Sequence, residues 1–143
     1  MSSDVTLHLP DSTAERLKAR AQQAGRTVDE VGALSIEEWL RQQEFPEIEF
    51  RAFGSERHAC LKGASPIWQI ILVAEGYGLN AEKTAAHFEW PLHRVQPAFG
   101  YYQVYPDDID RAIEENRALG FKQLRRLLPR LESFSPPPPP RHR

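Results

Sequence analysis

Two side chains that can bind a transition metal, those of His58 and Cys60, stand two positions apart in the sequence. A zinc site needs four ligands, which usually come as two such pairs at fixed spacing. No second pair at ligand spacing occurs among the five histidines and the one cysteine. We therefore interpret Cys60 as a structural thiol, and we predict no metal and no other cofactor.

The acidic and nucleophilic residues form no catalytic pattern either. Acids at the start of a helix are favoured by the helix dipole alone, so a solvated helix face explains the cluster after Pro106. Serines and histidines occur singly, without the strained turn that places a nucleophile beside its base. We predict that the chain is not an enzyme and has no catalytic residues. The acidic cluster consists of Asp107, Asp108, Asp110, Glu114 and Glu115.

The strongest chemical bias lies near the C-terminus. Residues 119–143 hold six Lys/Arg against one Asp/Glu, whereas residues 1–50 hold five against ten. After Gly120, apolar side chains recur at helical spacing beside basic ones, which predicts a basic amphipathic helix. Such a helix either closes its own domain or binds a partner of opposite charge. We favour the partner and assign its binding to Phe121, Leu124, Arg125, Arg126, Leu128 and Arg130.

The N-terminal segment predicts a strand followed by a helix. Residues 4–9 alternate polar and apolar side chains with a period of two, and Pro10 stops this alternation, which is typical of one short strand. A helix is then expected to begin with Ser12 as its cap, in a capping box with Glu15, and to end at Gly25.

A second capping box begins at Thr27, and the helix that follows is expected to run to about Glu44. A lone strand cannot bury Val5, Leu7 and Leu9, and both of its edges would lack hydrogen-bond partners. Pairing with the same strand of a second copy solves both problems. We therefore predict a homodimer that forms through the N-terminal strand.

The rest of the chain predicts a linker and a small helical bundle. Residues 45–65 show poor periodicity except for the alternating segment 47–51, so we expect a linker with one extended segment. Helical spacing then returns, and the first helix of this part is expected to stop at Gly76. The helix starts are predicted at Pro66, Asn80, Pro91 and Pro106.

Residues 4–44 resemble the ribbon-helix-helix (CopG/Arc-like) family of bacterial repressors and antitoxins. The resemblance rests on the alternating strand, Pro10, the first helix, the Gly25-Arg26-Thr27 turn and the second helix, in this order. It implies that two strands pair as an antiparallel ribbon that enters the major groove of DNA. The start of the second helix would hold a phosphate. The DNA-binding residues that it implies are Thr6, His8, Arg26 and Thr27.

A second resemblance covers about residues 53–117. Its landmarks are the segments 57–63, 66–68, 75–76, 95–102 and 106–110. They are similar to a small helix-turn-helix family labelled domain of unknown function 433, whose members are considered VapB-like antitoxins. Ala64-Ser65 stands where that family usually has Thr-Arg, and Pro97 lies inside the helix that would read DNA.

Both resemblances imply an antitoxin-like component of a type II toxin-antitoxin pair. It would neutralise a toxin, typically a PIN-type ribonuclease, through its C-terminal part, and it would regulate its own operator DNA. A stand-alone dimeric transcriptional regulator is one alternative. Another is a dimeric scaffold that has lost DNA binding, which Asp4, Pro97 and the acidic first segment favour.

The sequence thus predicts a mainly α fold in four parts. A ribbon-helix-helix unit spans residues 4–44, a linker 45–65, a helix-turn-helix-like bundle 66–119, and a basic helix with a polyproline tail 120–143. No apolar stretch is long enough to cross a membrane, and the N-terminus does not resemble a signal peptide. We expect a cytoplasmic protein without membrane contact.

Overall fold

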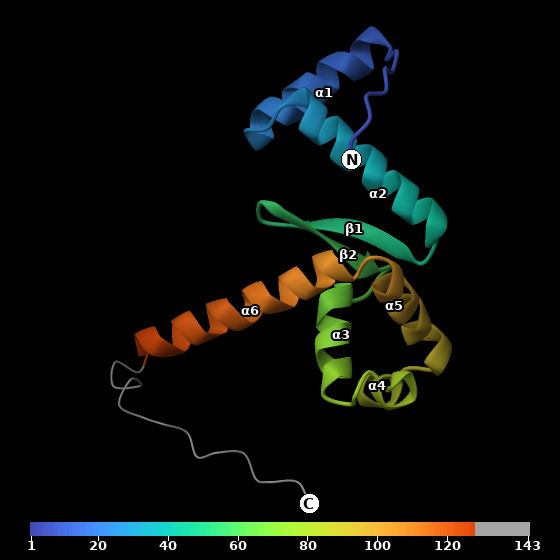
Figure 1. Ribbon diagram of the computed structural model, residues 1–143, viewed down its shortest axis with the longest axis vertical. Coiled ribbons are helices and arrows are strands. Elements are labelled where there is room, and N and C mark those ends of the chain that lie inside the picture. The colour runs from blue at the N-terminus through green and yellow to red at the C-terminus, as the bar shows by residue number, and fades with distance from the viewer. Residues whose placement is uncertain (128–143) are drawn as a thin grey trace, which may run out of the picture. The chain divides into compact units, whose positions relative to one another are not determined.

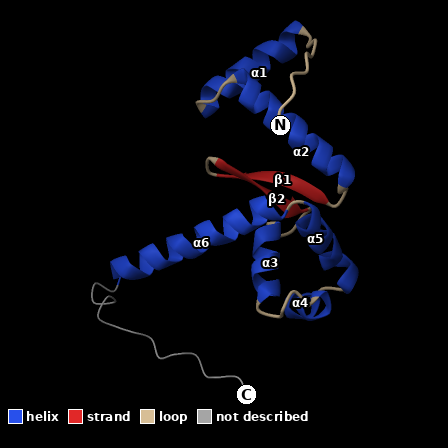
Figure 2. Cartoon of the chain, in the orientation of Figure 1, coloured by secondary structure: helices blue, strands red, loops and turns tan. Residues whose placement is uncertain are grey.

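The computed structural model describes residues 1–127 and shows helices together with one two-stranded antiparallel sheet (Figures 1 and 2). The prediction of a mainly α chain is therefore confirmed. The chain divides into two compact units, Met1–Ile67 and Trp68–Arg143, and the second is described as far as residue 127.

The first unit opens with helix α1 (Asp11–Ala24), which begins earlier than the sequence suggests. Pro10 occupies the N-cap position with φ −54° and ψ 148°, and no side chain caps the helix. The prediction that Ser12 is the cap was therefore wrong. Because Pro10 leads the chain directly into the helix, and its carbonyl accepts from the Ala14 amide at 2.9 Å, Ser12 already lies in the first turn.

The end of α1 and the start of helix α2 (Val28–Glu44) follow local rules. Gly25 adopts a left-handed conformation with φ 65°, and the Arg26 amide donates to the Ala21 carbonyl at 3.0 Å. The Thr27 hydroxyl accepts from the Glu30 amide at 3.1 Å, which caps α2. The predicted helix stop at Gly25 and the predicted start at Thr27 are confirmed.

Residues 1–10 belong to no helix or strand of the single chain. The predicted strand over residues 4–9 would take its hydrogen-bond partner from a second copy, so the strand and the homodimer stay predictions. Val5, Leu7 and Leu9 are all exposed in this segment.

Residues 45–65, which we expected to be a linker, contain a β-hairpin. Strand β1 (Ile48–Phe53) pairs with strand β2 (Glu56–Leu61) in a register that runs from Ile48 opposite Leu61 to Phe53 opposite Glu56. Gly54 turns the chain with φ 66°. The expected extended segment corresponds to β1, whereas β2 was not predicted because its first half is charged.

Two arginines fasten the hairpin within the first unit. Arg57 donates to both carboxylate oxygens of Glu38 in α2, at 2.7 and 2.8 Å. Arg51 donates to the Ala64 carbonyl. The forked contact between Arg57 and Glu38 has fixed geometry and is stronger than a neutral hydrogen bond. Arg57 therefore joins the hairpin to the second half of α2.

The second unit is built from helices α3 (Ile67–Glu75), α4 (Ala81–Phe88), α5 (Leu92–Val104) and α6 (Pro106–Leu127). The Asn80 side chain caps α4 by accepting from the Lys83 amide at 2.8 Å. These starts agree with the sequence analysis.

The core of the second unit is apolar and includes one buried polar residue. The Thr84 hydroxyl donates to the Asn80 carbonyl at 2.7 Å, so its burial leaves no unsatisfied donor. The buried side chains come from all four helices, and among the described side chains of α6 those that are buried lie in its first half. They include Ile70, Ile71, Ala74, Ala85, Val95, Ala98, Tyr101, Ile109, Ala112 and Ile113.

Helix α6 runs through Gly120 without interruption. The expectation that a separate helix starts after Gly120 was therefore wrong. A glycine inside a helix costs only about 1 kcal/mol relative to alanine, and good helix formers lie on both sides of it. Leu128, Arg130 and the polyproline tail lie outside the described residues.

The buried core of the second unit gives a stability prediction. Ile71 is fully buried, so Ile71→Ala should leave a cavity and lower the free energy of unfolding by about 2–5 kcal/mol. Val104 is 57% exposed, and Val104→Ala should change that free energy by less than about 0.5 kcal/mol. Denaturant unfolding of both variants measures this, and equal effects would contradict the described core.

Candidate functional site

A large apolar surface lies on residues 1–44. Among α1 and α2 only Ala21 is buried, so these helices do not enclose a core of their own. Monomeric proteins rarely expose a continuous apolar patch of this kind. On α2, Val28, Ile36, Trp39 and Leu40 fall within one third of the helix circumference, whereas the exposed Leu34 lies outside this face. The N-terminal apolar surface consists of Val5, Leu7, Leu9, Val28, Ile36, Trp39 and Leu40.

The predicted DNA-binding residues fall into two places in the first unit. Thr6 and His8 are exposed in the segment before α1, away from any helix or strand. Arg26 and Thr27 stand together at the start of α2. The Thr27 hydroxyl is already engaged as the helix cap.

Two carboxylates occupy the same end of α2. Asp29 and Glu30 lie in its first turn, where the partial positive charge of the helix dipole favours acids. A phosphate at this position would be repelled by both side chains. Asp29 and Glu30 therefore weaken phosphate binding at the α2 start, which Arg26 and the helix dipole would otherwise favour.

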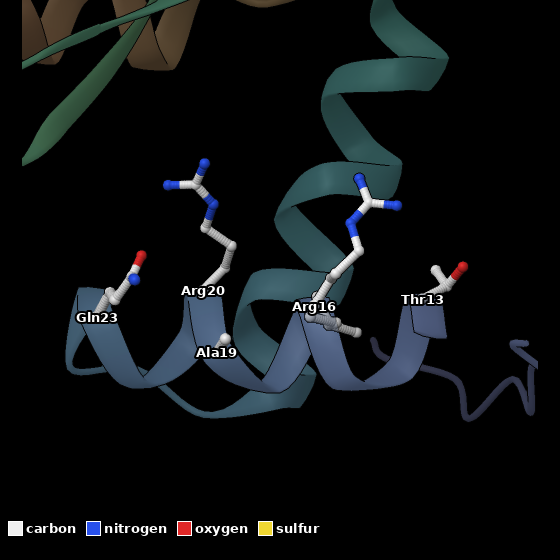
Figure 3. A pocket seen from close by; sticks show the side chains of 6 residues that line it. Thr13, Arg16, Ala19, Arg20 and Gln23 are labelled. Atoms are coloured by element: carbon white, nitrogen blue, oxygen red, sulfur yellow. The ribbon is translucent and has the colours of Figure 1, made fainter. Parts of the chain in front are cut away.

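A depression on α1 was not singled out by the sequence analysis. Figure 3 shows Thr13, Arg16, Arg20 and Gln23 projecting from the same side of the helix. All of its lining residues belong to α1, so the depression is an open surface and not an enclosed pocket. The sequence holds one signal for this depression. Arg16 and Arg20 are four residues apart, and this spacing places them on one face of a helix.

Helices α4 and α5 are joined by the short turn 89–91, in which Glu89 has φ 57°. Trp90 stacks on Phe88 with ring centroids 4.8 Å apart, and the Arg94 guanidinium lies 4.9 Å from the Trp90 ring centroid. These contacts fix the turn and the start of α5. Pro97 lies inside α5, and the helix continues to Val104 despite it.

The second half of α6 carries the predicted partner-binding residues. We call residues 114–127 the outer half of α6, and the described side chains from Glu114 to Arg126 are all exposed. Figure 1 shows this half extending away from α3, α4 and α5. Phe121 is 57% and Leu124 46% exposed. The Arg125 guanidinium lies 5.8 Å from the Phe121 ring centroid, so these two are brought together.

Two polar contacts attach α6 to its own unit. The Tyr102 hydroxyl in α5 donates to Asp110 at 2.6 Å. Arg117 donates to Glu75 in α3 at 2.7 Å. The hydrogen bond to Asp110, together with partial burial, raises the pKa of Tyr102 to about 12.

His58 and Cys60 lie on β2, where Cys60 is fully buried and its thiol donates to the His58 carbonyl at 3.4 Å. Burial raises the pKa of the Cys60 thiol, which disfavours the reactive thiolate. His58 pairs with Glu56 at 3.2 Å. Within residues 1–127, no three His, Cys, Asp or Glu side chains are arranged to hold a metal ion.

Comparison of the chain with protein-family models, with curated proteins and with solved structures finds no match. The two family resemblances therefore rest on the residues quoted above and stay predictions. In the part of the chain that the structure describes, no helix combines the length and the apolarity that crossing a bilayer requires.

The Tyr102–Asp110 contact gives a pH prediction. Because the pKa of Tyr102 is raised from 10.0 to about 12, the neutral phenol is favoured in the folded protein. The contact should therefore stabilise the fold fully below about pH 10, and this contribution should be lost as the pH rises to about 12. Tyrosinate absorbance of the unchanged chain and of Asp110→Asn should differ by one tyrosine, which titrates closer to pH 10 in the variant. Identical titration curves for the two chains would contradict this assignment.

Proposed function

We propose that the protein is an antitoxin-like, non-enzymatic homodimer that neutralises a partner protein through its C-terminal helix. One observation carries this proposal: the outer half of α6 is exposed and presents Phe121 and Leu124 beside Arg125 and Arg126. A helix with apolar anchors at such spacing is a common ligand for a groove on another protein. We also propose that it acts in the cytoplasm.

The partner is proposed to be a toxin of the PIN-type ribonuclease class. This class follows from the VapB-like resemblance, and its acidic metal site would attract arginines. Lys122, Arg125 and Arg126 supply positive charge in a stretch, residues 116–127, that has no acid. Guanidinium groups form forked hydrogen bonds with carboxylates, so this helix suits an acidic surface.

Dimerisation is proposed to occur through the N-terminal apolar surface. Pairing of residues 4–9 across two copies would give the strand its hydrogen bonds and would cover Val5, Leu7 and Leu9. The same contact would bury part of the apolar face of α2. A two-fold interface of this kind needs only one self-complementary surface.

Operator binding is the second candidate activity, and the acids at the start of α2 favour the scaffold alternative over it. Thr6, His8, Arg26 and Thr27 remain the proposed DNA contacts. Asp4, Asp29 and Glu30 lie near them and would oppose phosphate binding. A duplex of the upstream region, titrated at low salt, tests this activity directly.

The dimer gives the next prediction. Leu7→Asp places a charge on the predicted ribbon and should convert dimer to monomer, because the carboxylate would be buried unpaired in the interface. Thr6→Asp changes the opposite face of the same strand and should leave the dimer in place. Sedimentation equilibrium measures both variants, and a mass unchanged by Leu7→Asp would contradict a ribbon at residues 4–9.

The partner-binding helix gives a prediction that uses the product of the adjacent gene. Co-expression should yield a stable complex with the full chain, and a chain stopped after Leu119 should lose it. The full-length double variant Phe121→Asp/Leu124→Asp should also lose the complex, because both anchors are exposed and the substitution leaves the core intact. Val104→Asp is the matched surface control. Absence of a complex with the full chain would overturn the antitoxin proposal.

A further inference from the structure

Helix α1 carries two arginines, about one turn apart, that have no partner among the described residues. Arg16 and Arg20 are both exposed, and Figure 3 shows their side chains extending from the same side of the helix. Among residues 1–127, neither guanidinium has an acid within ion-pair distance. Like charges four residues apart repel each other and destabilise a helix. The described fold leaves this repulsion uncompensated.

The acids of α1 lie away from the two arginines. Asp11 and Glu15 are the acids of this helix, and each lies about 100° or more around it from Arg16 and from Arg20. Glu15 is also engaged, because Lys18 pairs with it at 3.4 Å. The side of α1 that carries the arginines therefore holds no acid of this helix.

Two polar side chains extend the arginine pair at its ends. Thr13, Arg16, Arg20 and Gln23 line the same depression and fall within about 80° of the helix circumference. We call these four residues the arginine row of α1. The row spans about 15 Å along the helix axis. A guanidinium group offers five donors and no acceptor, and threonine and glutamine can also donate. The row therefore suits an extended anionic surface better than a single small anion.

We propose that the arginine row of α1 binds an acidic helix of a partner protein, which presents carboxylates four residues apart. Such carboxylates follow each other at about 6 Å along their helix, the same spacing that Arg16 and Arg20 have along α1. Each guanidinium can hold one carboxylate through a forked pair of hydrogen bonds. Binding would also compensate the repulsion between the two arginines.

Nucleic acid suits the row less well than an acidic helix does. The side chains that line the depression include no aromatic ring on which a base could stack. A nucleic-acid strand also continues past the row, with a charge about every 3.4 Å. Residues 1–50 hold ten Asp/Glu against five Lys/Arg, so they would repel these further phosphates. An acidic helix can confine its charge to the length of the row.

This surface goes beyond the proposed function and does not depend on it. The proposed toxin contact lies on α6, whereas the arginine row lies on α1. A protein that fails to bind at one helix can still bind at the other, so the two proposals can fail separately.

A peptide titration tests the proposal with the full chain. The probe is an alanine-rich helical peptide with glutamate at every fourth position. The side-chain Nε–H signals of Arg16 and Arg20 in NMR spectra report binding at the row itself, and they separate it from binding at the arginines of α6. We expect both signals to shift and to saturate as peptide is added at about 0.1 M salt, where charges more than about 10 Å apart are screened. Signals that do not move would overturn the proposal.

Two charge reversals on α1 distinguish the row from general attraction. Arg16→Glu should weaken binding, measured at the Arg20 signal, about tenfold. The helix should persist, because a glutamate four residues before Arg20 forms a favourable pair. Lys18→Glu is the matched control, since it makes the same change of charge about 160° around the helix from both arginines. It should weaken binding less than about twofold. Equal losses in the two variants would overturn the row as the binding site.

A duplex DNA probe tests the rejected occupant in the same spectra. We expect DNA to shift the Arg16 and Arg20 signals only at higher concentration than the peptide does. Tighter binding of DNA than of peptide, lost in Arg16→Glu, would assign the row to nucleic acid and overturn the acidic-helix partner.

Discussion

The first 44 residues bury too few apolar side chains to form a stable core within one copy of the chain. Two helices that bury only Ala21 lack the tertiary packing that gives most helices in proteins their stability. The capping by Thr27 and the glycine stop define where these helices begin and end, but such contacts contribute only about 1 kcal/mol each. The N-terminal apolar surface therefore needs a partner surface, and the proposed homodimer supplies one without a second gene product.

The second unit differs because four helices enclose its core. This core positions α6 through Ile109, Ala112 and Ile113, and Tyr102 and Arg117 add polar contacts. Beyond Arg117 the described side chains of α6, as far as Arg126, are all exposed. A single element thus has a structural first half and an exposed second half, which is the arrangement that a binding helix requires.

Local rules correctly predicted several starts and ends of helices, because a cap or a stop acts through its own backbone conformation or side chain. The residues concerned are Gly25, Thr27, Asn80 and Pro106. Strand β2 could not be predicted in this way, because its first half is charged. It forms a strand by pairing with β1, and Arg57 is held by its hydrogen bonds to Glu38. The continuity of α6 depends on the small cost of one glycine. The apolar character of Phe121 and Leu124 and their helical spacing beside arginines could be predicted from the sequence, whereas their exposure on α6 could not.

Amide hydrogen exchange over residues 1–44, measured at several protein concentrations, tests the central claim that a second copy completes the first unit. We predict that amides of residues 4–9 become protected as concentration rises, in the alternating pattern of a strand, together with those of α2. Rapid exchange of these amides at every concentration, while the core helices of the second unit stay protected, would contradict it.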